Sequence, residues 1–195
     1  MSKEAAVLKI ELIGAPYPLW RRIQVDIGIT LEQLHEIIQI LFLWENCHLH
    51  HFIVGREIYA PKKNDEGNYE IKGYTEKTKL KDILKSAKQF MYEYDFGDSW
   101  LHNIAFEKIV SEEKKLAPKC LNGAGQDPLE DIGGVGGFAD FLEAVNKKKP
   151  SKETLELLEC RGLTLEEARA LPTTELDTEE INNDLYDFWD GLRRN

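Results

Sequence analysis

A tight turn between two expected strands brings acidic residues and a histidine together in the sequence. The stretch YEYDFGDSWLHNIAFE, residues 92–107, has Asp95 and Asp98 in the turn, and Trp100 and His102 on the strand that follows. Because strand side chains alternate, Trp100 and His102 lie on one face with apolar neighbours. Such a group could bind a metal, carry out acid–base chemistry, or hold the hairpin in register, since Asp side chains accept backbone N–H bonds in turns. The sequence leaves these three uses open.

Further histidines stand in the segment HLHH, residues 48–51. Alternation along a strand places His48 and His50 on one face and His51 on the other. Two imidazoles at this spacing can share one metal ion. The alternative is a solvated strand edge on which the histidines bind nothing.

The acidic segment DPLED, residues 127–131, and the glycines after it predict a long loop. Its carboxylates are hard oxygen ligands suited to magnesium, manganese or calcium, and the alternative is turn and helix-cap chemistry. The predicted metal ligands are His48, His50, His102, Glu130 and Asp131. The sequence fixes no cofactor, and a divalent metal is the candidate that these residues leave open.

Clustered carboxylates repel one another unless a cation lies between them. The adjacent residues Arg21 and Arg22 are expected on opposite faces of a strand, so that one of them pairs with a carboxylate of the turn or the loop. We therefore predict that the loop at residues 127–134 folds over the acidic turn, that Asp98 lies next to His102, and that an arginine rather than a metal joins turn and loop.

The composition limits the classes of function. The 195 residues carry a formal net charge of −10, which disfavours bulk binding of nucleic acid because phosphates need cationic partners. A protein partner or a cationic ligand fits this charge better. The three cysteines are an odd number at irregular spacing, so no disulfide framework is expected. With no signal peptide and no apolar run that could span a bilayer, the chain is expected in the cytoplasm and away from membranes.

Hydrophobic periodicity predicts a sheet with helices. Alternating segments near residues 7–14 and 20–27 predict a hairpin, and Thr30 with Gln33 has the capping-box spacing that begins a helix. Further strands and a short helix are expected up to residue 110, with residues 61–77 as a loop or mobile hairpin between them. Helices are expected again after residue 137.

The predicted fold class is α+β, with a mixed or antiparallel sheet, a packed helix in a β-grasp-like arrangement, and C-terminal helices. We expect a single domain over residues 1–195. Its parts are a sheet-plus-helix core at 1–112, a Gly-rich acidic loop at 113–137, and a helical part at 138–195.

Longer stretches of the sequence are similar to a known family. They are LWRRIQV (residues 19–25), LHEII (34–38), LWENCHLHHF (43–52), YEYDFGDSWLHNI (92–104) and PKCLNGAGQDPLEDIGGVGGFADFLEA (118–144). With them the chain resembles the plasmid pRiA open-reading-frame-three-like family, which is also met in passenger genes of bacterial transposable elements. The resemblance implies the fold and the polar cluster, but it supplies no mechanism, because the family has no established biochemical activity.

The chain departs from the family pattern at two positions. Leu43 stands where the family usually has glycine, and Asp127 stands where a second cysteine is common. The second departure argues against a pair of thiolates on a metal, although an Asp can still bind a hard metal ion.

Two functions of different classes follow from these residues. The first is a non-catalytic binding or adaptor module with a recognition groove. Its expected binding residues are Trp44, Tyr94, Asp95, Asp98, Trp100, Arg21 and Arg22. The second is a divalent-metal-dependent hydrolase, acting on a phosphoester or nucleic acid, in which the bound cation activates water. We favour the first, because the sequence has no catalytic motif of strict spacing and each candidate ligand also has a structural role.

Overall fold

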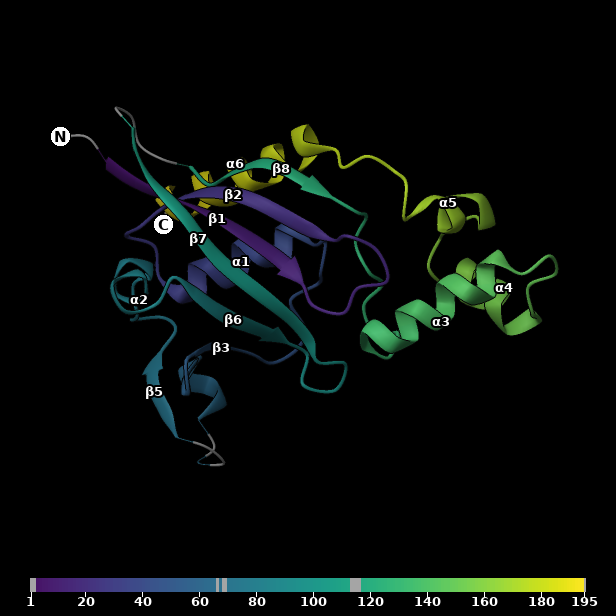
Figure 1. Ribbon diagram of the computed structural model, residues 1–195, viewed down its shortest axis with the longest axis horizontal. Coiled ribbons are helices and arrows are strands. Elements are labelled where there is room, and N and C mark those ends of the chain that lie inside the picture. The colour runs from purple at the N-terminus through teal and green to yellow at the C-terminus, as the bar shows by residue number, and fades with distance from the viewer. Residues whose placement is uncertain (1–2, 66, 68–69, 113–116, 195) are drawn as a thin grey trace.

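The centre of the protein is a large β-sheet. A computed structural model of the chain describes residues 3–65, 67, 70–112 and 117–194. Within these residues the strands form one eight-stranded sheet in the order β5-β4-β3-β6-β7-β1-β2-β8 (Figure 1). The strands are β1 (Lys3–Leu12), β2 (Trp20–Asp26), β3 (His50–Val54), β4 (Glu57–Ala60), β5 (Ile71–Tyr74), β6 (Gln89–Tyr94), β7 (Trp100–Glu112) and β8 (Lys119–Ala124). Neighbouring strands run antiparallel, except that β4 and β5 are parallel.

The predicted hairpin and its alternation are confirmed in β1 and β2. Leu8 lies opposite Ile23 and both are fully buried, whereas Lys9 lies opposite Arg22 on the other face. The same period of two on β7 buries Trp100, His102 and Ile104. One face of the sheet therefore carries the hydrophobic core.

The helix α1 (Leu31–Leu41) packs its apolar side against that face of the sheet. Its predicted capping box is confirmed, because the Gln33 amide donates to the Thr30 hydroxyl at 3.1 Å and the Thr30 amide donates to the Gln33 side chain at 2.9 Å. The helix ends at Leu41 with Phe42 as its C-cap, and the chain then turns through Leu43, whose φ is +50°. This exit carries the chain to the end of the sheet where α3 begins (Figure 1).

The remaining helices lie along or beyond the sheet. They are α2 (Leu80–Ser86), α3 (Gly134–Asn146), α4 (Lys152–Cys160), α5 (Leu165–Ala170) and α6 (Thr178–Arg194). The helices α3, α4 and α5 extend past one end of the sheet, while α6 runs beside β8 (Figure 1). The Asn182 side chain joins α6 to β8: it accepts from the Cys120 amide at 2.8 Å and donates to the Cys120 carbonyl at 3.0 Å.

Two segments predicted as loops contain regular structure. The 61–77 segment includes the 3₁₀ turn Lys62–Asn64 and the strand β5. The predicted 113–137 loop contains β8 and the first turn of α3, while its residues 113–116 lie outside the described part of the chain. Glycine-rich composition argues against a strand, but pairing with β2 supplies β8 with backbone partners that local sequence does not reveal.

The α+β class is confirmed, as a mixed, mostly antiparallel sheet with helices that include a C-terminal group. The finer expectation of a β-grasp arrangement stays a prediction. Among the described residues, none of the helices has the length and apolar character needed to cross a bilayer.

Candidate functional site

Three loops meet at one end of the sheet. They are residues 42–49 after α1, residues 95–99 between β6 and β7, and residues 125–133 between β8 and α3. Within the described chain, the non-glycine residues with positive φ all lie in these loops: Leu43, Asn46, Asp95, Ser99 and Asp131. Asn and Asp tolerate this conformation, but Leu and Ser adopt it only under constraint. Strained backbone of this kind concentrates at functional sites, so we take this end as the candidate site.

The 125–133 loop folds over the acidic turn, as predicted. The Asp98 carboxylate accepts from the Ile132 amide at 3.1 Å and from the Gly133 amide at 3.0 Å. Gly134 packs so closely that a Cβ placed on it would lie 2.2 Å from the Asp98 carbonyl oxygen. Asp95 uses its side chain locally, accepting from the Gly97 amide at 2.9 Å. Backbone amides therefore join turn and loop, where we had expected an arginine.

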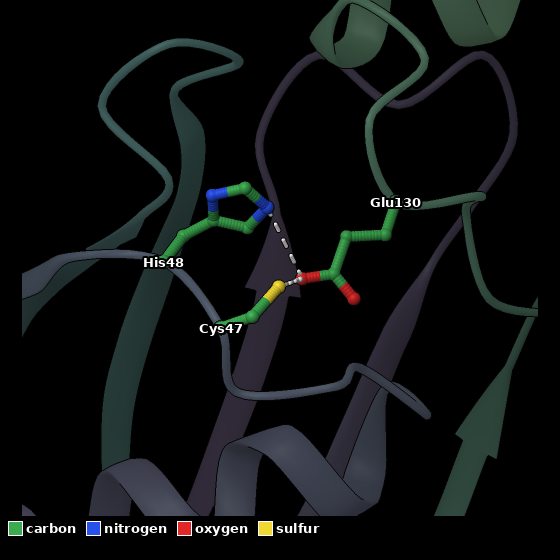
Figure 2. A group of neighbouring side chains, drawn as sticks. All are labelled: Cys47, His48 and Glu130. Carbon is green, nitrogen blue, oxygen red and sulfur yellow. Dashed lines mark hydrogen bonds and ion pairs between the residues drawn. The ribbon is translucent and has the colours of Figure 1, made fainter.

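Glu130 is the best-anchored carboxylate in this group. Its Oε2 accepts from the Glu45 amide at 2.8 Å, and its Oε1 accepts from the Tyr94 hydroxyl. The Cys47 thiol also points at Oε1, with Sγ 3.5 Å away (Figure 2). Because Glu130 is only 8% exposed, these contacts fix both of its oxygens in one orientation.

His48 bridges the turn and the loop. Its Nε2 lies 3.7 Å from Glu130 Oε1 and 3.1 Å from Asp131 Oδ1, while its Nδ1 lies 3.8 Å from Asp95 Oδ1. One imidazole thus stands among three carboxylates, one from the 95–99 turn and two from the 125–133 loop. The predicted grouping of His48 with Glu130 and Asp131 agrees with this geometry.

Cys47 is the site residue that the sequence reasoning missed. Its Sγ, a His48 ring nitrogen and a Glu130 oxygen all lie within 4.8 Å of one another. Partial loss of solvent around the thiol, with the charge of Glu130 beside it, raises the pKa of Cys47. Burial and the bond to Glu130 likewise raise the pKa of Tyr94 well above its usual value. Both groups are therefore protonated donors at neutral pH. The available signal was the placement of Cys47 directly before His48.

Arg21 pairs with the loop but does so in the core. Its Nη2 lies 2.6 Å from Asp127 Oδ1, and its other groups donate to the carbonyls of Leu41, Ala124 and Trp20. Burial raises the pKa of Asp127 to about 6, against the opposing pull of Arg21. The prediction that one arginine pairs with a loop carboxylate is confirmed. Arg22 faces the other side of the sheet, where it pairs with Glu107 at 2.9 Å, away from the site.

The site rests on a layer of buried aromatic side chains: Trp44, Tyr94 and Trp100. Their relative exposures are 7%, 0% and 0%. The Trp44 ring stacks on Tyr94 with centroids 4.9 Å apart and contacts Trp100 at 5.8 Å. The expected recognition groove lined by these rings is therefore wrong, because their faces are used in packing against one another.

His102 lies in the aromatic core and apart from the loops. Its Nδ1–H donates to the Trp100 carbonyl at 3.1 Å, and its ring packs on Phe42 and Trp44 at 4.8 and 5.2 Å. Its Nε2 has no hydrogen-bond partner among the described residues. Asp98 makes its bonds to the loop, so the predicted pair of Asp98 and His102 is wrong. His102 is a neutral core histidine.

His50 and His48 face different clusters, so the predicted pair does not form. The strand β3 begins at His50, and the period of two therefore does not extend back to His48. The His50 ring stacks on His35 with centroids 3.4 Å apart, and its Nε2 lies 3.4 Å from Glu32 Oε2. Both imidazoles are about 1% exposed, which makes them part of the packing under α1.

The His102 environment predicts a loss of stability in mild acid. Burial lowers the pKa of His102 to about 3, below the value of about 6.5 expected in the unfolded chain. A depressed histidine pKa contributes stability that is fully present above pH 6.5 and is lost as the pH falls toward 3. Between pH 7 and pH 5 this amounts to about 2 kcal/mol.

Urea unfolding at pH 7 and pH 5 measures this effect. The variant His102→Leu should lose less stability over that interval than the unchanged protein, whatever its absolute stability. Equal pH dependence in the two proteins would show that His102 does not resist protonation.

The fold and this site define a class of protein: an α+β chain in which three loops at one end of a mostly antiparallel sheet gather a thiol, an imidazole and several carboxylates. The sequence profile described as "Plasmid pRiA4b ORF-3-like protein" matches residues 4–170, so the chain belongs to that family. This confirms the resemblance drawn from the motifs.

The chain is also similar to two other proteins. An uncharacterized protein, y4hQ of Sinorhizobium fredii, is 32% identical over 154 residues, which cover 76% of this chain and 78% of the relative. The crystal structure of a protein of unknown function, MM3350 of Methanosarcina mazei, is similar with a TM-score of 0.71 and 32% identity. That match covers 81% of this chain and 90% of MM3350. Neither relative's description names an activity.

Proposed function

We propose that the protein is a non-catalytic binding module whose loop end docks a basic segment of another protein that also carries apolar side chains. The observation that carries this proposal is the exposure of large apolar residues on the strained loops. Leu43, Leu49 and Phe96 are 63%, 50% and 38% exposed. The Asp95 amide donates to the Leu49 carbonyl at 2.9 Å, so the loops that bear Leu49 and Phe96 lie side by side.

The charge at this end favours a cationic partner. Glu45 and Asp98 belong to the same loops as the exposed apolar residues, and Asp131 of the adjoining 125–133 loop has a side chain that is 62% exposed. Arg161 is near but donates to the Glu130 carbonyl at 2.6 Å. Complementary charge steers partners and fixes their orientation, so lysine or arginine beside an apolar residue fits this surface. We place the module in the cytoplasm, where a thiol such as Cys47 stays reduced.

Leu43 has a strained backbone conformation that burial of its side chain does not offset. It holds a positive φ, yet most of its side chain is exposed. It also stands at a cavity of about 430 Å³ whose other walls include Leu129, Arg161 and Leu163. Glycine adopts this backbone without strain, and the family usually has glycine here. An exposed leucine on this strained turn supports a role in contact with a partner.

Leu43→Gly therefore separates binding from stability. The variant should be more stable by about 1 kcal/mol because backbone strain is relieved. It should bind a synthetic peptide of alternating lysine and leucine about fivefold more weakly, a loss of about 1 kcal/mol. Calorimetric titration measures the affinity and urea unfolding measures the stability.

The controls are matched in chemistry. Leu192→Ala removes a leucine of 44% exposure on α6 and should leave the affinity unchanged. A peptide of alternating glutamate and leucine should not bind. Equal affinity of the unchanged protein and Leu43→Gly for the basic peptide would overturn the proposal.

A second candidate function is a divalent-metal-dependent hydrolase acting on a phosphoester. One observation favours it, namely that residues of metal-ligand type from separate loops converge at Cys47, His48 and Glu130. A site with three protein ligands leaves a position at which a metal can activate water. Turnover of bis(p-nitrophenyl) phosphate by metal-loaded protein, abolished in Glu130→Gln, would favour this candidate over the binding module.

A further inference from the structure

Going beyond the proposed docking function, we infer that Cys47, His48 and Glu130 form a binding site for a Zn²⁺ ion. The ligand atoms are Cys47 Sγ, His48 Nε2 and Glu130 Oε1 (Figure 2). The Sγ–Oε1 distance is 3.5 Å and the Nε2–Oε1 distance is 3.7 Å. With bonds of about 2.0–2.3 Å to a tetrahedral zinc, neighbouring ligand atoms lie about 3.3–3.8 Å apart. Both distances fall within this range.

The residues around these ligands hold them in that arrangement. The Tyr94 hydroxyl donates to Glu130 Oε1 and accepts from the amides of Cys47 and His48 at 3.0 and 3.4 Å. One buried hydroxyl thus ties together the segments that carry all three ligands. Asp95 Oδ1 lies 3.8 Å from His48 Nδ1, the ring nitrogen that faces away from Glu130. At this ion-pair distance the carboxylate favours the ring orientation in which Nε2 faces Glu130.

The charges of the group also call for a cation. Asp95, Glu130 and Asp131 surround a single imidazole, which supplies one positive charge at most. Arg161 binds the Glu130 backbone carbonyl at 2.6 Å, and Arg21 pairs with Asp127 in the core. A divalent ion at the centre of the ligand triangle would offset the excess negative charge.

The donor atoms select the kind of metal. Sulfur, nitrogen and oxygen together suit zinc, whereas magnesium and calcium take oxygen ligands. The sequence had suggested a hard metal ion on Glu130 and Asp131. The donor set in the structure instead fits zinc, a metal ion of borderline softness. The Asp131 side chain is exposed, and its Oδ1 lies 3.1 Å from His48 Nε2. Asp131 can therefore supply the fourth ligand or leave that position to water. Coordination releases the Cys47 thiol proton to solvent, giving a thiolate bound to zinc.

Cobalt substitution tests the site on the full, untagged chain. One Co²⁺ per chain should bind and show both the visible bands of tetrahedral cobalt and a near-ultraviolet thiolate-to-cobalt band. Zn²⁺ should displace it, and a large excess of Mg²⁺ should not. Cys47→Ser should abolish the thiolate band and weaken binding at least tenfold, and His48→Gln should weaken it similarly.

The matched control is Cys160→Ser, which removes the other exposed cysteine and should leave spectrum and affinity unchanged. Circular dichroism checks that each variant folds. Because Cys47 and His48 are not buried, their variants should fold, so they test the metal site even if Glu130→Gln unfolds. Cobalt binding that is equally tight and spectrally unchanged in Cys47→Ser, or no binding below millimolar metal, would overturn the inference. Neither result bears on the affinity for the lysine–leucine peptide.

Discussion

Replacing Gly134 with alanine should cost about 3 kcal/mol or more of folding free energy and separate the 125–133 loop from the acidic turn. The position has φ +66°, and the added Cβ would lie 2.2 Å from the Asp98 carbonyl oxygen. That contact is to backbone, so no side chain can rotate away to relieve it. The bonds from the Ile132 and Gly133 amides to Asp98 would then be lost together.

Gly136 provides a control on the same helix. A Cβ there meets nothing within 4 Å, and the residue lies inside α3 with an exposed surface. Gly136→Ala should therefore stabilise the protein by about 0.5–1 kcal/mol, because alanine favours the helix more than glycine. Urea unfolding gives both free energies, and hydrogen exchange at Ile132 and Gly133 reports whether the loop is released. Protection of those amides in Gly134→Ala equal to that in the unchanged protein would contradict the argument.

Replacing Arg21 with methionine should cost about 3–5 kcal/mol, the largest effect expected of any charged residue in the chain. Methionine can fill the space of the aliphatic stem, but it leaves Asp127 buried without a cation and three carbonyls without their donor. The neighbouring variant Arg22→Met breaks the part-exposed pair with Glu107 and a cation–π contact with Trp20, and should cost at most about 1 kcal/mol.

The same variant should be sensitive to pH in a defined direction. The pKa of Asp127 is already raised by burial to about 6, and removing Arg21 raises it further. An acid whose folded pKa lies above its unfolded value loses stability as the pH rises toward the folded pKa. The difference in unfolding free energy between Arg21→Met and the unchanged protein should therefore grow between pH 5 and pH 7.

A double variant identifies the source of the cost. In Arg21→Met with Asp127→Asn neither member of this pair is charged, so much of the stability should return and the added pH dependence should vanish. If the double variant is as unstable as Arg21→Met alone, the unpaired carboxylate is not the cause.

Features encoded by short-range pattern could be predicted from the sequence. The capping box of α1 depends on residues three apart, and the inward direction of Trp100 and His102 depends on a period of two. The position of His48 could not be predicted in this way, because alternation holds only within a strand and β3 begins two residues later. The two-residue alternation of side chains therefore predicts nothing about residues that lie outside the strand.

Contacts between distant segments lay beyond the sequence reasoning. Cys47 meets Glu130 across 83 residues, and Arg21 meets Asp127 across 106. The resemblance indicated which segments belong to the site, but not which side chains would touch. The strand β8 was missed for the same reason, since its pairing with β2 outweighs the glycines at positions 123 and 125.

The pair of hydrogen bonds between Asn182 and Cys120 has a consequence for self-association. The strand β8 is the last in the sheet, and an outermost strand offers its free amides and carbonyls to any extended chain that approaches. The Asn182 amide group supplies one acceptor and one donor to Cys120, as a residue of a neighbouring strand would. Since α6 runs beside β8, an added strand could pair with the sheet at Cys120 only after displacing the Asn182 side chain, which hinders fibrous growth from this edge.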